Sequence, residues 1–298
     1  MCYDFKIMYF YGKHNGLDTK GNFTTVKPAD KVVAKHIAYY YFHSSDDEAF
    51  DSKFTFYPNY MHAITIYKNS DVRFTENASI VRPSAQEGIG CYYSINTNQS
   101  FSVDIEGRFT KIGIVFNPLG LNHFLNKPLS EAFEPSFGPF DYFGKPLLDV
   151  VGQITKLGDA RAGAALLDGF FSEAYCGFEE AAVKRAVQEI LNSNGTIKVE
   201  ELSDAIGVNR KMLLRLFRKH LCCSVEEYKK MVMFRNALNY AQQAGEDATL
   251  TDVALFNYYY DQAHYIKHFK SVTMQSPKIL LSKLTNLGNE SLYWNFEE

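Results

Sequence analysis

The chain has 298 residues and a formal net charge of −3, with 46% of its residues hydrophobic and 22% charged. This is an ordinary soluble globular composition with enough apolar material for about two domains, and it excludes a protein that attracts nucleic acid through its overall charge. No apolar run approaches the roughly 18–20 residues of a membrane span, and residues 1–16 lack the charged-then-apolar pattern of a secretory signal.

The cysteines bear on the compartment in which the protein resides. None of the five lies in a C-x-x-C pair, and the adjacent pair has poor geometry for a mutual disulfide or a shared zinc ion. The five are Cys2, Cys91, Cys176, Cys222 and Cys223. We therefore expect reduced thiols, a cytoplasmic protein and no membrane partner.

The first half of the chain is predicted to be rich in strands. Residues 1–30 suggest loops and short strands, and residues 32–42 fit either a strand or the start of a buried helix. Short segments rich in β-branched and aromatic residues follow at 53–58, 62–68, 72–76, 100–107 and 110–116. Apolar residues alternate with others in 101–105 and 112–116, as in sheets with one buried face. So many strands in so short a stretch predict a barrel or sandwich.

After Pro118 the pattern changes to helices broken by glycine and proline. These helices are expected within 119–133, 144–158 and 160–175. We place a domain boundary near Cys176, so that 1–177 is a β-rich domain with flanking helices and 178–298 is an all-α domain. The predicted fold class is therefore α+β.

The second domain begins with an amphipathic helix over 179–193 and a short helix over 199–206, followed by a turn at Gly207. Asn209 is a good N-cap for the next helix, in the segment GVNRKMLLRLFRK at 207–219. One face of that helix is apolar and the opposite face carries five cations, with Leu214 between them. The apolar residues are Met212, Leu213, Leu216 and Phe217, and the cations are Arg210, Lys211, Arg215, Arg218 and Lys219.

This arrangement is typical of a helix-turn-helix with a DNA-reading helix. Residues 207–235 hold eight cations against two anions, so the basic charge is local. The alternative interpretation of this stretch by itself is a solvated basic helix. A repeat of the motif favours DNA binding. After a predicted linking helix over 225–243, the segment DQAHYIKHFK matches RKMLLRLFRK at a spacing of 52 residues from Arg215 to Lys267. Such a linking helix would hold two reading helices about one turn of duplex, ~34 Å, apart.

Residues 196–281 resemble the C-terminal DNA-binding domain of the AraC/XylS family of bacterial transcription regulators. The matching segments are VEELSDAIGVNRKMLLRLFRKHL, EEYKKMVMFRNAL, LTDVALFNYYYDQAHYIKHFK and QSP before a final helix. The N-terminal half resembles, more weakly, a domain found with some members, through FTFYPNYMHAITIY and IGIVFNPLGLNHFLNKPLSEAF. The resemblance implies a first helix-turn-helix unit at about 198–220 and a second at about 250–271, around the linking helix.

The resemblance also implies which residues meet DNA. The base-reading positions fall on Lys211, Leu214 and Arg215 in the first unit, and on Gln262, Ala263, Ile266 and Lys267 in the second. Gln pairs well with adenine, and Arg or Lys with guanine. The phosphate contacts are expected from Arg210, Arg218, Lys219 and Lys270, which position the protein without choosing sequence.

Several family positions carry unusual residues here. The second unit has Tyr258 where the family has its turn glycine, and Met274 where a later glycine stands. The first unit has Cys222 at a loop glycine, and the linking helix has Met233 at a usual arginine. Glycine adopts positive φ at little cost, so these changes predict altered turns. They leave open an alternative function, a ligand- or protein-binding module whose DNA-binding domain is degenerate.

The implied partners are double-stranded promoter DNA, a small-molecule effector in the N-terminal domain, a second copy of the chain in a homodimer, and RNA polymerase if the protein activates transcription. Eight aromatic residues could line an effector pocket, but the default expectation for most of them is a place in the core. They are Tyr39, Tyr40, Tyr41, Phe54, Phe56, Tyr57, Tyr60 and Tyr67.

An enzyme is not predicted. The chain has no G-x-S-x-G, P-loop or G-x-G-x-x-G pattern, and its histidines lack the spacing of a cupin metal set. His264 and His268 are spaced like zinc ligands, but we assign them a structural role because no glutamate follows the first. We therefore predict no catalytic residue, no metal and no cofactor.

Overall fold

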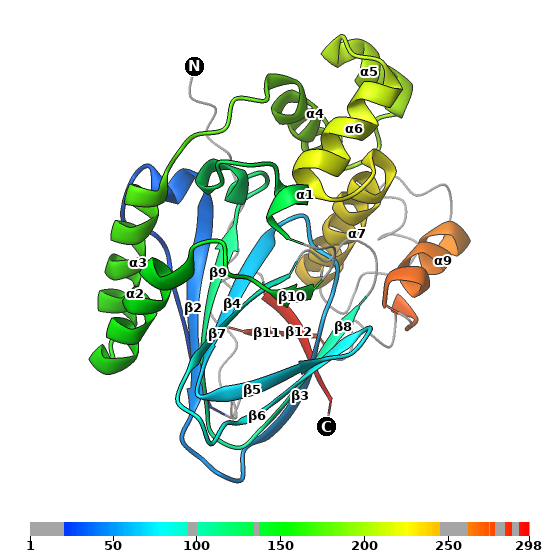
Figure 1. Cartoon of the computed structure of the whole chain (residues 1–298). Helices are drawn as coiled ribbons and strands as arrows, with labels where there is room; N and C mark the ends of the chain where they lie inside the picture. Colours follow the sequence, from blue (N-terminus) through cyan, green and yellow to red (C-terminus); the bar gives the residue numbers. More distant parts are fainter. Residues whose placement is uncertain are drawn as a thin grey trace.

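In the computed structural model, the described residues are 21–94, 100–133, 137–244, 262–273, 275–277, 284–287 and 292–297. The structure contains two sheets of six strands each, built mainly from the N-terminal half, which we call sheet A and sheet B (Figure 1). Sheet A consists, in order, of β1 (Asn22–Val26), β2 (Ile37–Ser45), β9 (Phe109–Phe116), β4 (His62–Lys68), β7 (Ile89–Ser94) and β10 (Phe137–Pro139). Sheet B consists, in order, of β11 (Leu284–Leu287), β12 (Leu292–Glu297), β3 (Asp51–Phe56), β8 (Phe101–Glu106), β6 (Ala78–Pro83) and β5 (Ser70–Phe74).

Neighbouring strands pair antiparallel, except that β6 and β8 are parallel. The five predicted strand segments correspond to β3, β4, β5, β8 and β9, and the β-rich N-terminal half is confirmed. The ambiguous segment 32–42 contains the short 3-10 helix η1 (Val33–Lys35) and then the start of β2.

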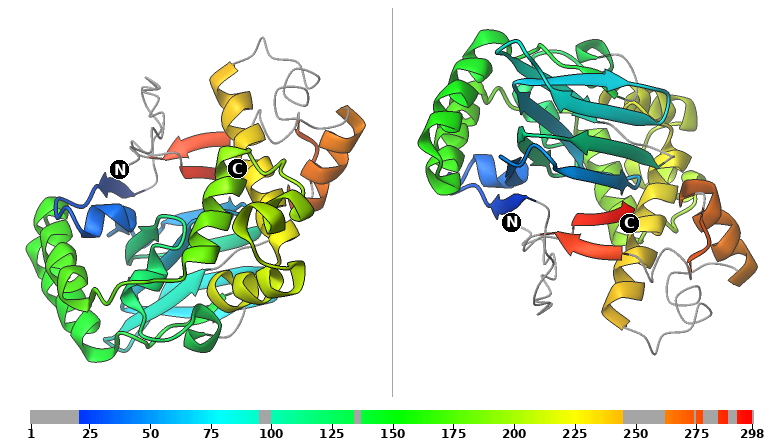
Figure 2. Two further views of the ribbon diagram at one scale, coloured as in Figure 1. Left: turned by 90° about the horizontal axis from the view of Figure 1, so that it is seen from above. Right: turned by 90° about the horizontal axis from the view of Figure 1, so that it is seen from below.

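Alternating residues of sheet A face two different layers. Ile64, Ile66, Ile112 and Ile114 belong to the hydrophobic core shared with helices α2 (Gly144–Leu157) and α3 (Ala160–Ala174). The intervening residues of the same strands face sheet B, because successive side chains of a strand point to opposite sides. Sheet A is therefore buried on both faces, whereas the pattern alone predicted one buried face. Helices α2 and α3 lie on one side of the sheets, and the helices of the C-terminal half lie on another (Figure 2).

Residues 119–133 differ from the helix expected there. They form η2 (Leu121–Phe124) and the single turn α1 (Leu129–Ala132), separated by an extended segment that contains Pro128. Leu119 has a left-handed backbone (φ 62°), and a side chain at Gly120 would meet the His36 carbonyl oxygen at 2.0 Å. The chain lies against the His36 backbone at Gly120, and the backbone is already extended at Leu125 (ψ 131°), so η2 does not continue into a regular helix.

The described part of the C-terminal half is helical up to Thr273, as predicted, but the half is not all-α because two strands follow. Its helices are α4 (Ala181–Asn192), α5 (Val199–Ile206), α6 (Arg210–Leu221), α7 (Val225–Ala244) and α9 (Gln262–Thr273). The first helix of the second unit and Tyr258 lie outside the described residues, as does Met274.

The end of the chain returns to the N-terminal half. β11 and β12 pair with each other, and β12 pairs with β3 so that Trp294 lies opposite Phe56. The resemblance implied a final helix after Pro277, but residues 278–283 lie outside the described residues; the described segments beyond them, 284–287 and 292–297, are these two strands. The alternating sequence LYWNFE favours a strand, and the otherwise open edge of β3 supplies backbone partners for it. The range 178–298 therefore contributes two strands to sheet B.

Candidate nucleic-acid interface and ligand cavity

The basic helix α6 is fixed by the turn that precedes it. Gly207 ends α5 in the left-handed conformation (φ 77°), and the Asn209 side chain accepts a hydrogen bond from the Met212 amide at 2.8 Å. Leu213, Leu216 and Phe217 are buried in a core shared with α4, α5 and α7. The cap and the buried stripe predicted from the sequence together set which face of α6 meets solvent.

The solvent face of α6 carries the predicted DNA contacts. Lys211, Arg215, Arg218 and Lys219 are exposed, and Leu214 is half-buried beside them. The exposed Arg210 forms an ion pair with Glu200 on α5. This pair bridges the two helices of the unit, so Arg210 contributes to their relative orientation as well as to the charge of the surface.

The helix α9 repeats this arrangement with less charge. Tyr265 and Phe269 are buried, as their counterparts Leu213 and Phe217 are in α6. Ala263, Lys267 and Lys270 are exposed, Ile266 is half-buried, and the side chain of Gln262 lies outside the described set. The exposed predicted residues of each unit therefore lie on the helix face opposite to its core, whereas Ile266 packs against the core formed by α7 and α9.

The linking helix α7 packs against both basic helices. Its Tyr228 ring lies 5.7 Å from the Phe217 ring of α6, and its Phe234 ring lies 5.1 Å from the Phe269 ring of α9. With 20 residues, α7 is about 30 Å long. Tyr228 lies in the first turn of α7 and Phe234 near its middle, so this one helix contacts both units.

Cys222 ends α6 in a left-handed conformation (φ 56°), at the position where the related family has glycine. The predicted altered turn is therefore wrong at this position, since Cys222 takes up the left-handed conformation although it tolerates it less well than glycine. Cys223 beside it is buried, and burial raises the pKa of its thiol well above the usual range. Cys223 therefore serves as a packing residue in the core of the first unit.

An arginine that the sequence analysis did not single out joins the two halves. Arg235 on α7 donates from Nε to the Pro58 carbonyl oxygen at 2.5 Å and from Nη2 to the Tyr57 carbonyl oxygen at 2.6 Å. Both hydrogen bonds are buried. The Tyr57 side chain also belongs to the core formed by α7 and α9, so the segment after β3 is inserted into the C-terminal half.

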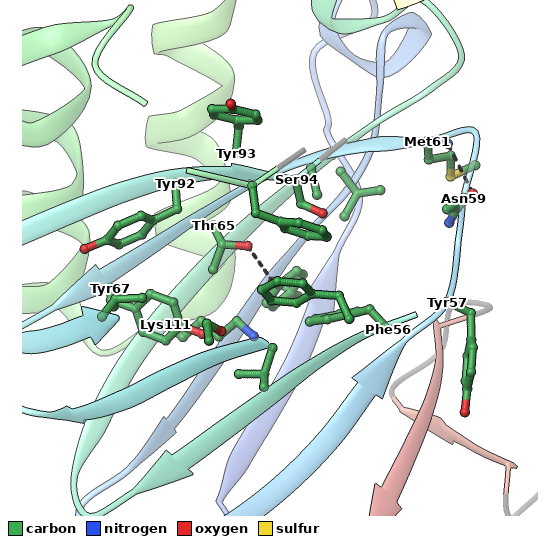
Figure 3. A pocket seen from close by; sticks show the side chains of 18 of the residues that line it. Phe56, Tyr57, Asn59, Met61, Thr65, Tyr67, Tyr92, Tyr93, Ser94 and Lys111 are labelled. Carbon is green, nitrogen blue, oxygen red and sulfur yellow. Dashed lines mark hydrogen bonds between the residues drawn. The ribbon is translucent and has the colours of Figure 1, made fainter. Parts of the chain in front are cut away.

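A cavity lies between sheets A and B (Figure 3), with about 920 Å³ of empty space including its open mouth. Of the eight aromatic residues considered above, those that line it are Tyr39, Tyr41, Phe56, Tyr57 and Tyr67. Tyr40 and Phe54 are core, as was the default expectation, and Tyr60 packs against the core of the first unit. Arg235 also lines the cavity, so its wall includes a residue of the C-terminal half.

Lys111 on β9 extends into this cavity (Figure 3). It is 1% exposed, and its Nζ lies 4.8 Å from the ring centroid of Phe54 and 5.3 Å from that of Phe56. The rings of Tyr41 and Tyr67 are each 5.5 Å away. Burial lowers the pKa of the Lys111 ammonium to about 7. Facing aromatic rings stabilise the charged form, but the loss of water has the larger effect.

The sequence analysis did not single out Lys111, because alternation in TKIGIVF places it with Gly113 and Val115 on the face that a sheet with one buried face leaves in solvent. A Cβ at Gly113 would collide with the Tyr41 ring at 1.8 Å, which is why that ring can lie flat across the strand. In the part of the chain that the structure describes, no group of three His, Cys, Asp or Glu side chains could hold a metal ion. Within the same residues, no helix is both long and apolar enough to cross a bilayer.

Comparison with known proteins gives matches at the level of structure. Solved structures similar to this chain include crystal structures of ToxT, an AraC-family regulator, from Vibrio cholerae. A 1.65 Å structure has 11% identity and a TM-score of 0.44, covering 89% of this chain and 98% of that one. A structure bound to an unsaturated fatty acid has 13% identity and a TM-score of 0.44, covering 91% and 97%. No family profile and no curated protein matches the sequence. Identity and superposition are both low, so residue roles in this chain rest on its own geometry.

Proposed function

We propose that this protein is a sequence-specific DNA-binding transcription regulator, with α6 as its main DNA-reading helix. The observation that carries this proposal is the exposed cationic face of α6, held outward by the Gly207 turn, the Asn209 cap and a buried apolar stripe. The repeated helix α9, joined through α7, supports it. Arg215 and Lys211 are proposed to read bases, and Arg218 and Lys219 to hold phosphates.

Selection of bound sequences from random double-stranded DNA with the full chain tests this function. We expect enrichment of sites with two contacted segments about one helical turn apart. A variant with Lys211, Arg215, Arg218 and Lys219 all changed to alanine should enrich nothing. The control variant Lys156→Ala removes an exposed cation at the end of α2, far along the chain from the helix-turn-helix units, and should enrich the same sites. Absence of enrichment by the unaltered chain at low salt would favour the alternative, a binding module with a degenerate DNA-binding domain.

We further propose that the cavity between the sheets is the effector site, and that its ligand is an apolar molecule with one anionic group. The walls are aromatic, and Lys111 is a cation inside them. An anion within hydrogen-bond distance of the Lys111 ammonium would be attracted strongly in this space, because little water screens the charges there. Because Arg235 lines the same cavity, an occupant would contact both halves of the protein. ToxT binds an unsaturated fatty acid in one of its structures, a ligand of this chemical class.

Titration calorimetry with octanoate and 1-octanol tests the anion. The two probes share an alkyl chain and differ in charge. We expect octanoate to bind more tightly to the unaltered chain, and the preference to disappear in Lys111→Met, which keeps most of the side-chain length and removes the charge. Equal affinity for acid and alcohol would contradict the role of Lys111. RNA polymerase contact and homodimer formation stay predictions from the family resemblance.

A further inference from the structure

The segment between α3 and α4, residues 175–180, is here called the linker, and it is hydrogen-bonded to the backbone of His123. The amides of Cys176 and Gly177 donate to the His123 carbonyl oxygen at 3.0 and 3.1 Å. The Cys176 thiol also lies 3.3 Å from that oxygen. These residues lie between the end of α3 and the start of α4. His123 therefore holds the point at which the chain passes from the N-terminal half to the C-terminal half.

The ring of His123 is part of a continuous stack. It lies face to face with the His36 ring, with centroids 3.7 Å apart and planes at 23°. Tyr175 of the linker is stacked 5.4 Å from His36 and 5.9 Å from His123. Phe178 lies edge-on to His123 at 5.8 Å. The Phe178 ring also lies 5.1 Å from the His220 ring on α6. The rings thus extend from the N-terminal half through the linker to the basic helix.

The α6 end of this stack is also attached to the N-terminal half. The Asn122 side chain, next to His123 in η2, donates to the backbone oxygen of His220 at 3.0 Å in a buried hydrogen bond. His220 is 4% exposed. Displacement of η2 would therefore disturb the linker and α6 together.

The charges around the histidines are mostly positive. Lys35 and Lys184 act on His36, while Lys184 and His36 itself act on His123. Glu179 and Glu180 are the nearby anions, paired with Lys184 at 4.0 Å and with His220 at 3.9 Å, and Lys219 also acts on His220. Burial first, and then these cations, lower the pKa of His36 to about 4 and that of His123 to about 3. Both imidazoles are uncharged at neutral pH, and two imidazolium rings at 3.7 Å would repel each other strongly.

We propose that the stacked pair His36 and His123 forms a proton-sensitive clasp that holds the linker and α6 on the N-terminal half, and that acidification releases it. Protonation separates the rings, η2 shifts, and Tyr175 and Phe178 lose their contacts. The clasp itself stands on the ring geometry, and its consequence for transcription rests on the proposed function.

The sign of the pH effect follows from linkage. The docked arrangement holds both histidines below their ordinary pKa of about 6.5, so it binds fewer protons than the released one. The docking free energy is therefore fully present above pH 6.5 and is lost as pH falls towards 4. One unit of pKa difference changes the docking equilibrium about tenfold, so an effect of tenfold or more is expected.

Hydrogen exchange of the linker amides at Cys176 and Gly177, corrected for intrinsic rates, measures release directly. We expect their protection to fall about tenfold or more between pH 6.5 and 4.5, while amides of β9 stay protected. The double variant His36→Phe and His123→Phe keeps two stacking rings and should remove this dependence. His62→Phe is the matched control, because His62 is buried in β4 with a pKa also lowered to about 4 but has no part in the stack. It should behave like the unaltered chain.

Three results would overturn the clasp. They are constant linker protection in the unaltered chain, an unchanged pH dependence in the double variant, and loss of linker and β9 protection together. Should the double variant not fold, NMR titration of the histidine rings in the unaltered chain decides. Ring titration must then coincide with loss of linker protection, and titration near pH 6.5 without such loss contradicts the proposal. No DNA is present in these assays, so their outcome is independent of whether the proposed DNA-binding function holds.

Discussion

Replacing Arg235 with alanine is expected to loosen the contact between the two halves of the protein. The guanidinium makes two short hydrogen bonds, to the carbonyl oxygens of Pro58 and Tyr57, and both are buried. Hydrogen bonds to a charged group contribute about 1.5–3 kcal/mol each, and a buried carbonyl left without its donor costs further free energy. Allowing for partial hydration of the space that alanine leaves, we expect a loss of about 2–4 kcal/mol in the free energy of unfolding.

Urea denaturation followed by circular dichroism measures this loss. The variant Arg235→Lys keeps the positive charge but not the forked geometry, and should fall between the unaltered chain and the alanine variant. Lys230→Ala, an exposed cation on the same helix, is the control and should change stability by no more than about 0.5 kcal/mol. If Arg235→Ala matched this control, Arg235 would not be a main attachment between the halves.

Two further predictions concern single side chains. Asn209→Ala removes the cap on the Met212 amide and should cost about 0.5–2 kcal/mol in the free energy of unfolding, measured by urea denaturation, whereas Asn209→Ser should restore most of it; equal stability of all three chains would contradict the cap. The affinity for octanoate should fall about tenfold per pH unit above a pH of about 7, because the Lys111 ammonium is lost there. Calorimetry across that range should show no such slope in Lys111→Met, and a slope that persists in this variant would refute the assignment.

The helices of the C-terminal half were predictable because their signals are local. The apolar spacing of Leu213, Leu216 and Phe217, the Asn209 cap and the Gly207 turn all lie within a dozen residues. At Cys222 the predicted altered turn was wrong, because this residue takes up the positive φ (56°) although it is not glycine. Such short-range patterns determine helix boundaries and faces before any tertiary contact is known.

The residues that connect the halves were not predictable, because their partners are distant in sequence. The acceptors of Arg235 lie 177 and 178 positions away. Alternation placed Lys111 opposite the isoleucines of β9, which on a sheet with one buried face means exposure to solvent. A second sheet buries it instead. The pairing of β12 with β3 likewise joins the end of the chain to its first third, and no local signal specifies that partner.

Substitution of Arg215 and of Lys219 tests most directly whether the exposed face of α6 reads DNA. Binding isotherms of the full chain on a selected site and on its single-base variants, over a range of salt concentrations, separate the two roles. We expect Arg215→Ala to cost about 1–3 kcal/mol and to relax preference at one base position, while Lys219→Ala weakens all sites alike and lowers the salt slope by about one. If Arg215→Ala left both affinity and base preference unchanged, α6 would not be the reading helix.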